Sequence, residues 1–334
     1  MNLLAMLRRV RLEPFTVALL LTLAVGVLLP SRGEAARITS GASTLGIGLL
    51  FFLHGSKLSR RAILAGAGHW RLHLSVLAAT FVAFPLLGLT ISAIPAAVLN
   101  PNLAAGFLFL SLLPSTVQSS IAFTAIARGN VPAAVCSASL SNVLGVALTP
   151  LLVGLLMSAH GAGLSWHSVQ TILLELLAPF VAGHLLQPVI GGWVGRHRRL
   201  VSLVDRGSIL LVVYCAFSGA AVAGVWSRVS PGDLATVVAL SSVLLAAMLW
   251  ITMWAARRFG FSRADEVVLA FCGSKKSLAS GVPIAAALFP AAAVGGVILP
   301  LMVFHQIQLT VCAVLARRYA DRAEVDAQAL GVAA

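Results

Sequence analysis

Long apolar runs, separated by short polar segments, follow one another along the whole chain. Ten runs can be distinguished, and most approach the roughly 20 residues that cross the hydrocarbon core of a bilayer as a helix. The pattern therefore predicts an all-α polytopic membrane protein with ten transmembrane helices. The predicted spans are residues 14–30, 43–58, 72–93, 103–127, 132–157, 169–190, 209–226, 234–255, 267–288 and 291–315.

The composition agrees with this pattern. Hydrophobic residues make up 59% of the 334 residues and charged residues only 10%, whereas about a quarter of the residues of a soluble domain are charged. The first run also fits a signal peptide, since it follows a basic arm and precedes the small residues of 33–36. The count of ten helices needs this segment, so we expect it to be retained.

The positive charge is concentrated in alternate loops. Of the 23 lysines and arginines, only Arg32, Arg37 and Arg228 fall in one set of loops, and Lys275 and Lys276 fall within a span. The others fall in the opposite set of loops or beside the two termini, so the positive-inside rule predicts cytoplasmic N- and C-termini. Topology thus explains the net charge of +13 without a nucleic-acid partner.

The two halves of the chain share a weak internal similarity. PAAV at 132–135 has a counterpart in PAAAV at 290–294, and at the same offset Gln118 and Ser119 align with Lys276 and Ser277. Five helices per half would give two copies of opposite orientation, because five is odd. We therefore predict two inverted five-helix repeats, residues 1–160 and 161–334.

The fourth and ninth spans, which correspond in this scheme, both contain helix-breaking residues. Pro114 lies within the fourth span, and Gly273, Gly281 and Pro283 lie within the ninth. Broken helices at membrane depth are tolerated where they are buried in protein or line a watery cavity. In transporters they form the substrate site, so we predict that the two breaks cross and bind the solute.

Lys275 and Lys276 stand at the second break, where each charge costs about 2.5–3.5 kcal/mol on insertion scales. With the positive ends of half-helices nearby, they favour an anionic substrate. Alternatively, a lysine reaches an aqueous surface or forms a structural ion pair, and the neighbouring hydroxyls bond their own helix carbonyls. The candidate binding residues are Ser115, Thr116, Gln118, Ser119, Ser120, Ser139, Asn142, Ser274, Lys275, Lys276 and Ser277.

Three residues are candidates for a proton carrier or counter-ion. Glu175 is the acidic residue that lies clearly within a span, and paired with a buried lysine it could exchange a proton near neutral pH. Its alternative position is nearer the membrane interface. His54 and His305 also lie in spans, where a histidine is either a proton relay or a hydrogen-bonded packing residue.

No enzyme, metal or cofactor signature is found in the sequence. The chain lacks HExxH, GxSxG and Walker motifs, and its four cysteines are isolated. We therefore predict no metal, no cofactor and no enzymatic activity, although an intramembrane enzyme using Cys272 or His305 stays a remote alternative. No loop is long enough for a nucleotide-binding domain, so transport must use gradients or be passive.

Three segments together resemble the bile acid:sodium symporter superfamily, and within it the bacterial group related to sodium/bile acid cotransporter 7. They are FFLHGSKLS at 51–59, FCGSKKSLASGVPIA at 271–285 and FHQIQL at 304–309. The resemblance covers nearly the whole chain. It implies a bacterial inner-membrane protein whose ten helices form a panel domain and a core domain, each built from both repeats.

The sequence departs from the sodium-coupled members at the ninth helix. Phe271 and Lys275 stand where the resemblance places a sodium-binding glutamate and glutamine, and Ser119-Ser120 stands where a Ser-Asn pair is expected. We infer that a lysine fills the former sodium site, leaving proton coupling, exchange or uniport. The predicted function is alternating-access transport of small organic anions (bile acid-like, carboxylate or sulfate). The alternative is a membrane regulator of calcium homeostasis that moves no solute.

Overall fold

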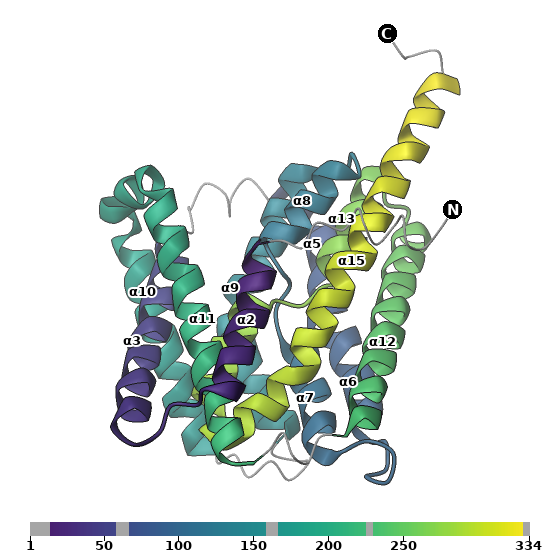
Figure 1. Ribbon diagram of the computed structural model, residues 1–334. Coiled ribbons are helices and arrows are strands. Elements are labelled where there is room, and N and C mark those ends of the chain that lie inside the picture. Colours follow the sequence, from purple (N-terminus) through teal and green to yellow (C-terminus); the bar gives the residue numbers. More distant parts are fainter. Residues whose placement is uncertain (1–13, 58–66, 158–165, 225–229, 330–334) are drawn as a thin grey trace.

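The computed structural model describes residues 14–57, 67–157, 166–224 and 230–329, in which every regular element is helical (Figure 1). A π-helical turn at Ala79–Ala83 joins α5 to α6. A second π-helical turn, at Val153–Met157, follows α9 directly. A 3₁₀ turn, Ala67–His69, precedes α5. In chain order the helices are α2 (Pro14–Leu28), α3 (Gly33–Lys57), α5 (Trp70–Ala78), α6 (Phe84–Ser92), α7 (Pro101–Leu112), α8 (Gln118–Ile126), α9 (Val131–Leu152), α10 (Trp166–Arg196), α11 (Arg198–Val222), α12 (Pro231–Arg258), α13 (Arg263–Gly273), α14 (Leu278–Leu288) and α15 (Ala291–Ala329).

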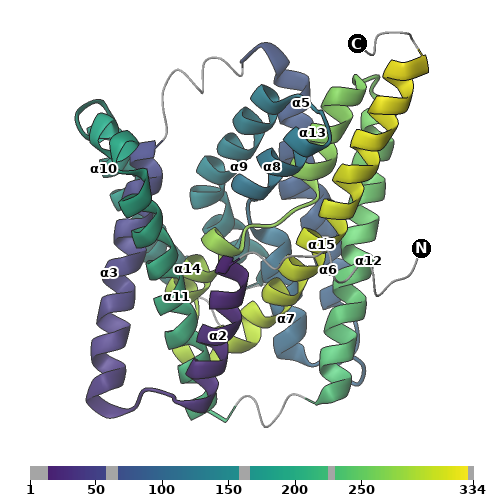
Figure 2. The ribbon, with the colours of Figure 1, turned by 45° about the horizontal axis from the view of Figure 1, so that its top comes forward.

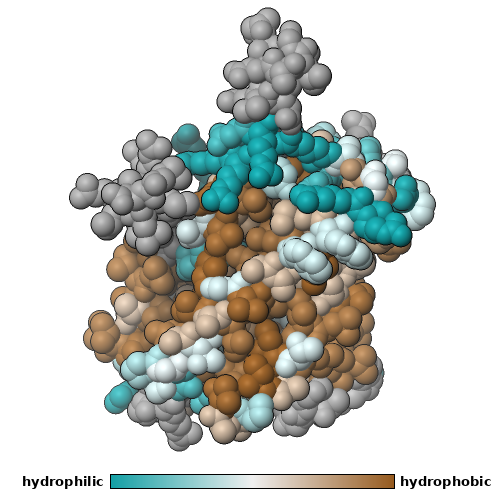
Figure 3. Space-filling view, turned by 90° about the vertical axis from the view of Figure 1, so that its right-hand side faces the viewer, coloured by the Kyte–Doolittle hydropathy of each residue, from teal (hydrophilic) through white to brown (hydrophobic). Residues whose placement is uncertain are grey.

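Seven helical segments of the described residues are long and apolar enough to cross a membrane. A broad apolar band covers the face drawn in Figure 3, with hydrophilic residues gathered at one end. Large apolar side chains such as Leu28, Leu45 and Val189 are 76%, 77% and 79% exposed, as expected for side chains that face lipid. The chain is therefore an all-helical integral membrane protein. The seven segments are Gly33–Lys57, Trp70–Ser92, Val131–Met157, Leu176–Arg196, Arg198–Val222, Pro231–Arg258 and Ala292–Arg322.

Polar residues just before the apolar runs set several helix starts. Asn100, Asn130, Ser230, Ser262 and Ser277 each accept a hydrogen bond from a backbone N–H in the first turn of the helix that follows. Such N-caps satisfy donors that the first turn cannot pair internally. Four of these caps precede segments that the apolar pattern predicts, and the fifth, Ser277, restarts a helix inside a predicted span.

The helices pack in two groups (Figure 2). In one group α3 packs along α10 and α11, and α11 also packs against α2. The other group surrounds the short helices α7, α8, α13 and α14 with α5, α6, α9, α12 and α15. Contacts of α11 with α15 and of α10 with α9 join the groups. The short helices thus lie inside the second group, beside the first.

Basic side chains tie several elements together at the end where α15 finishes. Arg257 Nη2 donates to Glu266 Oε1 at 3.1 Å, Arg71 to the carbonyl of Phe259 at 3.3 Å, and Arg263 to the carbonyl of Tyr319 at 3.2 Å. These contacts join the ends of α12 and α15 to the starts of α5 and α13. Helices from both halves of the chain therefore present positive charge at one end of the molecule.

Three predicted boundaries were wrong by ten residues or more. α3 begins at Gly33, before the predicted start at 43, α11 begins at Arg198, before the predicted start at 209, and α15 continues to Ala329 beyond the predicted end at 315. In each case charged and polar residues outside the predicted span are helical. Arginine is a good helix former, so hydropathy marks where a helix leaves the lipid and not where it ends.

We predict that Gly183→Ala destabilises the protein, because α3 and α10 approach closely at this position. A Cβ at Gly183 would lie 1.9 Å from the carbonyl oxygen of Phe52, and overpacking of this kind costs about 1–3 kcal/mol. The measurement is thermal unfolding in detergent. Gly192→Ala in the same helix is the matched control, since a Cβ there meets nothing within 4 Å. Equal unfolding temperatures for the two variants would contradict the packing.

Candidate functional site

Two interrupted helices meet at the centre of the second group. α7 ends at Leu112 and α8 begins at Gln118, while α13 ends at Gly273 and α14 begins at Leu278. The N–H of Ser277 donates to the carbonyl of Pro114 at 2.9 Å, so the two interruptions touch. α8 packs against α13, and Phe109 of α7 lies edge-on to Phe289, just after α14, at 5.5 Å. The interruptions occur at the predicted places.

The interruption after α7 leaves backbone carbonyls without their helical donors. Pro114 has no N–H to give to Leu110, whose carbonyl instead accepts from Leu113 at 3.3 Å. The N–H of Ser115, which would continue the helix by bonding Ser111, donates to Ser141 Oγ at 3.1 Å. The carbonyls of Ser111 and Leu113 therefore require donors from elsewhere in the protein.

A third carbonyl is freed by the π-helical turn between α5 and α6. The N–H of Phe84 bonds the carbonyl of Ala79, five residues back, and not that of Thr80. The next possible donor, residue 85, is a proline and has no N–H. The carbonyl of Thr80 is thus left without a partner in its own helix.

The side chain of Lys276 satisfies all three of these carbonyls. Its Nζ lies 2.8 Å from the oxygen of Thr80, 2.8 Å from that of Ser111 and 2.6 Å from that of Leu113. An ammonium has three N–H donors, so each one is used. Lys276 is fully buried, and its charge is further stabilised by the ring of Phe84, whose centroid is 4.2 Å from Nζ.

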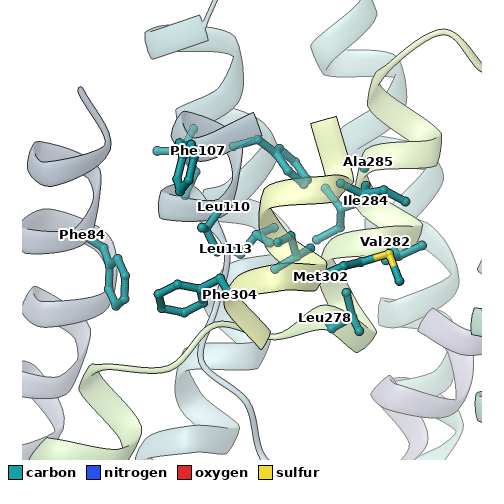
Figure 4. Close-up of a cluster of buried hydrophobic side chains, with 14 of the residues drawn as sticks. Phe84, Phe107, Leu110, Leu113, Leu278, Val282, Ile284, Ala285, Met302 and Phe304 are labelled. Carbon is teal, nitrogen blue, oxygen red and sulfur yellow. The ribbon is translucent and has the colours of Figure 1, made fainter. Parts of the chain in front are cut away.

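The backbone of Lys276 is held by Gln308 of α15. The N–H of Lys276 donates to Gln308 Oε1 at 2.9 Å, and Gln308 Nε2 donates to the carbonyl of Lys276 at 2.9 Å. The side-chain amide thus replaces both bonds of a helical peptide group. Figure 4 shows the apolar packing around the crossing, with Phe304 facing Phe84 and Leu113 beside it. This packing keeps the polar contacts away from water.

The capping is reciprocal, because hydroxyls at the first interruption satisfy carbonyls at the end of α13. Ser115 Oγ donates to the carbonyl of Cys272 at 2.5 Å, and Ser120 Oγ donates to that of Phe271 at 3.0 Å. Each interrupted helix therefore supplies donors for the carbonyl end of the other. The crossing is held by backbone groups that have no other partner at this depth.

Lys275 is also fully buried but has different surroundings. Its Nζ donates to Ser119 Oγ at 3.1 Å and lies 4.4 Å from the centroid of the Phe123 ring. Ser119 Oγ donates to Thr116 Oγ1 at 2.9 Å, and Thr116 Oγ1 lies 3.0 Å from Ser120 Oγ. A chain of hydroxyls thus connects Lys275 to the crossing.

The burial of both lysines excludes the alternative that they reach an aqueous surface. Within the described residues neither lysine forms an ion pair with a carboxylate. Backbone N–H groups at the crossing are also engaged, at Ser115, Lys276, Ser277 and Ser280. The ammonium of Lys276 has no proton left for a ligand.

The other candidate binding residues are only partly brought together. Ser274 bonds the carbonyl of Ala270 in its own helix, as the structural alternative expected. Asn142 Oδ1 accepts from Ser280 Oγ at 2.8 Å, which ties α9 to α14. Gln118 is exposed and Ser139 is half-buried. The hydroxyl cluster of α8 is therefore the part that lies at the lysines.

The proton-carrier candidates occupy three separate places. His305 Nδ1 lies 2.8 Å from Gln308 Nε2, beside the crossing. His54 lies in the first group, where its Nδ1 is 2.8 Å from the carbonyl of Leu50, near the ion pair of Lys57 with Asp205. Glu175 belongs to α10, but its side chain lies outside the described residues.

Comparison with known protein families gives a match over nearly the whole chain. The model of the SBF-like CPA transporter family matches residues 13–321. The chain belongs to this family. The match spans both interruptions and all of the helices that surround them, so the expected resemblance to the bile acid:sodium symporter superfamily is confirmed.

Relatives in this transporter family cover nearly the whole chain. The protein named "Putative symporter YfeH" of Escherichia coli is 53% identical over 313 residues, 94% of each chain. An uncharacterized protein of Pseudomonas aeruginosa is 55% identical over 322 residues, 96% of this chain and 97% of its own. Sodium/bile acid cotransporter 7 of the rat is 24% identical over 316 residues, 93% of each chain.

Sequence reasoning missed several residues that build the crossing. Gln308 lies in the FHQIQL segment used for the resemblance, yet it was not connected to the lysines. Ser280 was overlooked as a partner, although it is a hydroxyl in an apolar run. Pro85 leaves one upstream carbonyl without a donor, but a regular α-helix would place it at Phe81, and only the π turn shifts it to Thr80.

We predict that Gln308→Leu destabilises this transporter by several kcal/mol. The substitution leaves the buried N–H and carbonyl of Lys276 unpaired, and each costs about 1–3 kcal/mol. Gln306→Leu, on the same helix and not fully buried, is the matched control. The measurement is thermal unfolding of both variants in detergent. A Gln308→Leu variant as stable as the control would contradict the role assigned to the amide.

Proposed function

We propose that this protein is a secondary transporter that moves small organic anions by alternating access through the crossing. The observation that carries the proposal is the meeting of two interrupted helices with two buried ammonium groups in a helical membrane protein of a transporter family. Interrupted helices place partial charges and polar side chains at membrane depth, where a solute site is needed. The substrate class follows from the positive charge of the lysines.

We further propose the ten-helix arrangement with two inverted repeats. If α5 and α6, α7 and α8, and α13 and α14 each form one span, the described helices make ten spans, including the shorter α2. α7, α8 and α9 have counterparts in α13, α14 and α15 at a nearly constant spacing along the chain. The polypeptide of α7 and α8 approaches the end where α15 finishes, whereas that of α13 and α14 leaves it (Figures 1 and 2).

The two packing groups correspond to the panel and core domains that the resemblance implies. The group of α2, α3, α10 and α11 would be the panel, and the group around the crossing would be the core, each drawn from residues 1–160 and 161–334. The basic end with α15 would face the cytoplasm of a bacterial cell, following the positive-inside rule. Movement of one group against the other would expose the crossing to each side in turn.

Transport is proposed to be independent of sodium. Carbonyl ends of half-helices are typical cation ligands in transporters, and here the ammonium of Lys276 occupies that position with three contacts of 2.6–2.8 Å. A second cation at the same place would be repelled. The name of sodium/bile acid cotransporter 7 indicates bile acids as the solute class and sodium as the ion. For this protein we propose a solute of the same class and no coupling to sodium.

Lys275 is the lysine proposed to attract the anion, because one hydrogen bond leaves part of its ammonium available. The hydroxyls of Ser119, Thr116 and Ser120 would orient the solute, and Asn142 and Ser139 would extend the polar surface toward α10. The site is sealed in this structure, since Lys275 is 0% exposed. Substrate would therefore reach it only after the two helix groups move.

The test is flux into liposomes that contain the purified protein. Labelled bile acids, aliphatic carboxylates and organic sulfates serve as probes, with protein-free liposomes as the control. We expect saturable uptake of at least one anion class, at equal rates when sodium is replaced by choline. Uptake that requires sodium would contradict the coupling, and failure of every anion class would contradict the transport function. Absence of both anion flux and calcium flux would favour the alternative of a regulator that moves no solute, and calcium flux without anion flux would contradict both readings.

A further inference from the structure

The two adjacent lysines differ in what the loss of a proton would do. Deprotonation of Lys276 would leave one of its three carbonyl partners without a donor, at a cost of about 1–3 kcal/mol for a buried group. Lys275 has Ser119 as its one hydrogen-bond partner among the described residues. A neutral amine still has two N–H groups, so Lys275 keeps this bond in either form.

The partner of Lys275 can also change its role in a hydrogen bond, whereas the partners of Lys276 cannot. Carbonyl oxygens only accept hydrogen bonds, whereas a hydroxyl accepts and donates. The hydrogen-bonded hydroxyls run from Ser119 through Thr116 to Ser120 and end at the carbonyl of Phe271. Each hydroxyl can rotate, so the direction in which it donates its hydrogen bond can change. This chain of hydroxyls can therefore follow a change of charge on Lys275 without breaking the crossing.

The surroundings of Lys275 make its charge costly. Its titratable neighbours are the thiols of Cys272 on α13 and Cys312 on α15, the imidazole of His305 on α15 and the ammonium of Lys276. α8 contributes Ser119 and Phe123, which do not titrate in this range. Within the described residues no carboxylate pairs with Lys275, and the fixed charge of Lys276 next to it opposes a second positive charge.

We propose that Lys275 binds and releases a proton during transport and thereby couples the anion to protons, while Lys276 stays permanently charged. The proposal rests on the transport function proposed above and names its coupling ion. Protonated Lys275 attracts the anion. When the site opens to the other side, the anion leaves and the ammonium gives its proton to water, forming hydronium and a neutral amine.

This cycle carries one proton with each monovalent anion, so no net charge crosses the membrane. The empty site returns with a neutral Lys275 and takes up a proton from water on the first side. Because Lys275 is fully buried in the sealed arrangement, its proton cannot exchange with both sides at once. A pH gradient, and not a membrane potential, should therefore drive accumulation of the anion.

The first test is direct observation of the lysine side chains by NMR. The chain has three lysines, Lys57, Lys275 and Lys276, so selective ¹⁵N labelling of the lysine side chain gives three signals, assigned with single Lys→Gln variants. Between about pH 6 and pH 10 the Lys275 signal should change from ammonium to amine, and the Lys276 signal should stay that of an ammonium. A Lys275 signal that does not change, or a Lys276 signal that does, overturns the proposal.

The second test is flux, which separates this proposal from the transport function. In proteoliposomes the wild type should take up the transported anion in response to an inward proton gradient, with no effect of a potassium-diffusion potential. Lys275→Gln should lose this response, and Lys57→Gln, outside the crossing, should keep it. If the wild type transports the anion at a rate that does not depend on the proton gradient, the proton coupling is wrong and the transport function stands. If no anion moves, the transport function fails, and the NMR titration still decides whether Lys275 exchanges its proton.

Discussion

The structure depends on the need to pair backbone carbonyls that three breaks in helical geometry leave open inside an apolar protein. Pro114, Pro85 and the π turn before it remove the usual donors, and an unpaired carbonyl at this depth costs several kcal/mol. The ammonium of Lys276 meets three of these carbonyls at once. A buried lysine without partners would destabilise the protein, and so would unpaired carbonyls. Here the lysine and the carbonyls pair with each other and both costs are removed.

This pairing explains why two adjacent lysines need not have one role. Lys276 points to the end of α7 and is saturated, whereas Lys275 points to α8 and meets one hydroxyl and aromatic rings. Under the proposed function, the fixed ammonium of Lys276 takes the place of a coupled sodium ion, because the three carbonyls accept from a cation that the chain itself supplies.

Much of this arrangement is predictable from sequence, and the limits have physical causes. Gly273, Pro114 and the charged pair at 275–276 mark the interruptions, because few residue types break a helix or carry charge in an apolar run. The partners of Lys276 are backbone atoms, and no side-chain pattern identifies them. Gln308 acts on a segment far away in the chain, so only the packing of α15 against α14 connects them. The helical extension of α15 was missed because polarity ends a span but not a helix.

The central claim is that Lys276 replaces a bound monovalent cation, and the thermal stability of Lys276→Met in different salts tests it most directly. In choline chloride this variant should unfold at a lower temperature than the wild type. Sodium should then restore its stability saturably, by binding the vacated carbonyls in the folded protein alone. Wild type and Lys275→Met should not respond. Sodium stabilisation of the wild type, or a Lys276→Met variant as stable as the wild type in choline, would contradict the claim.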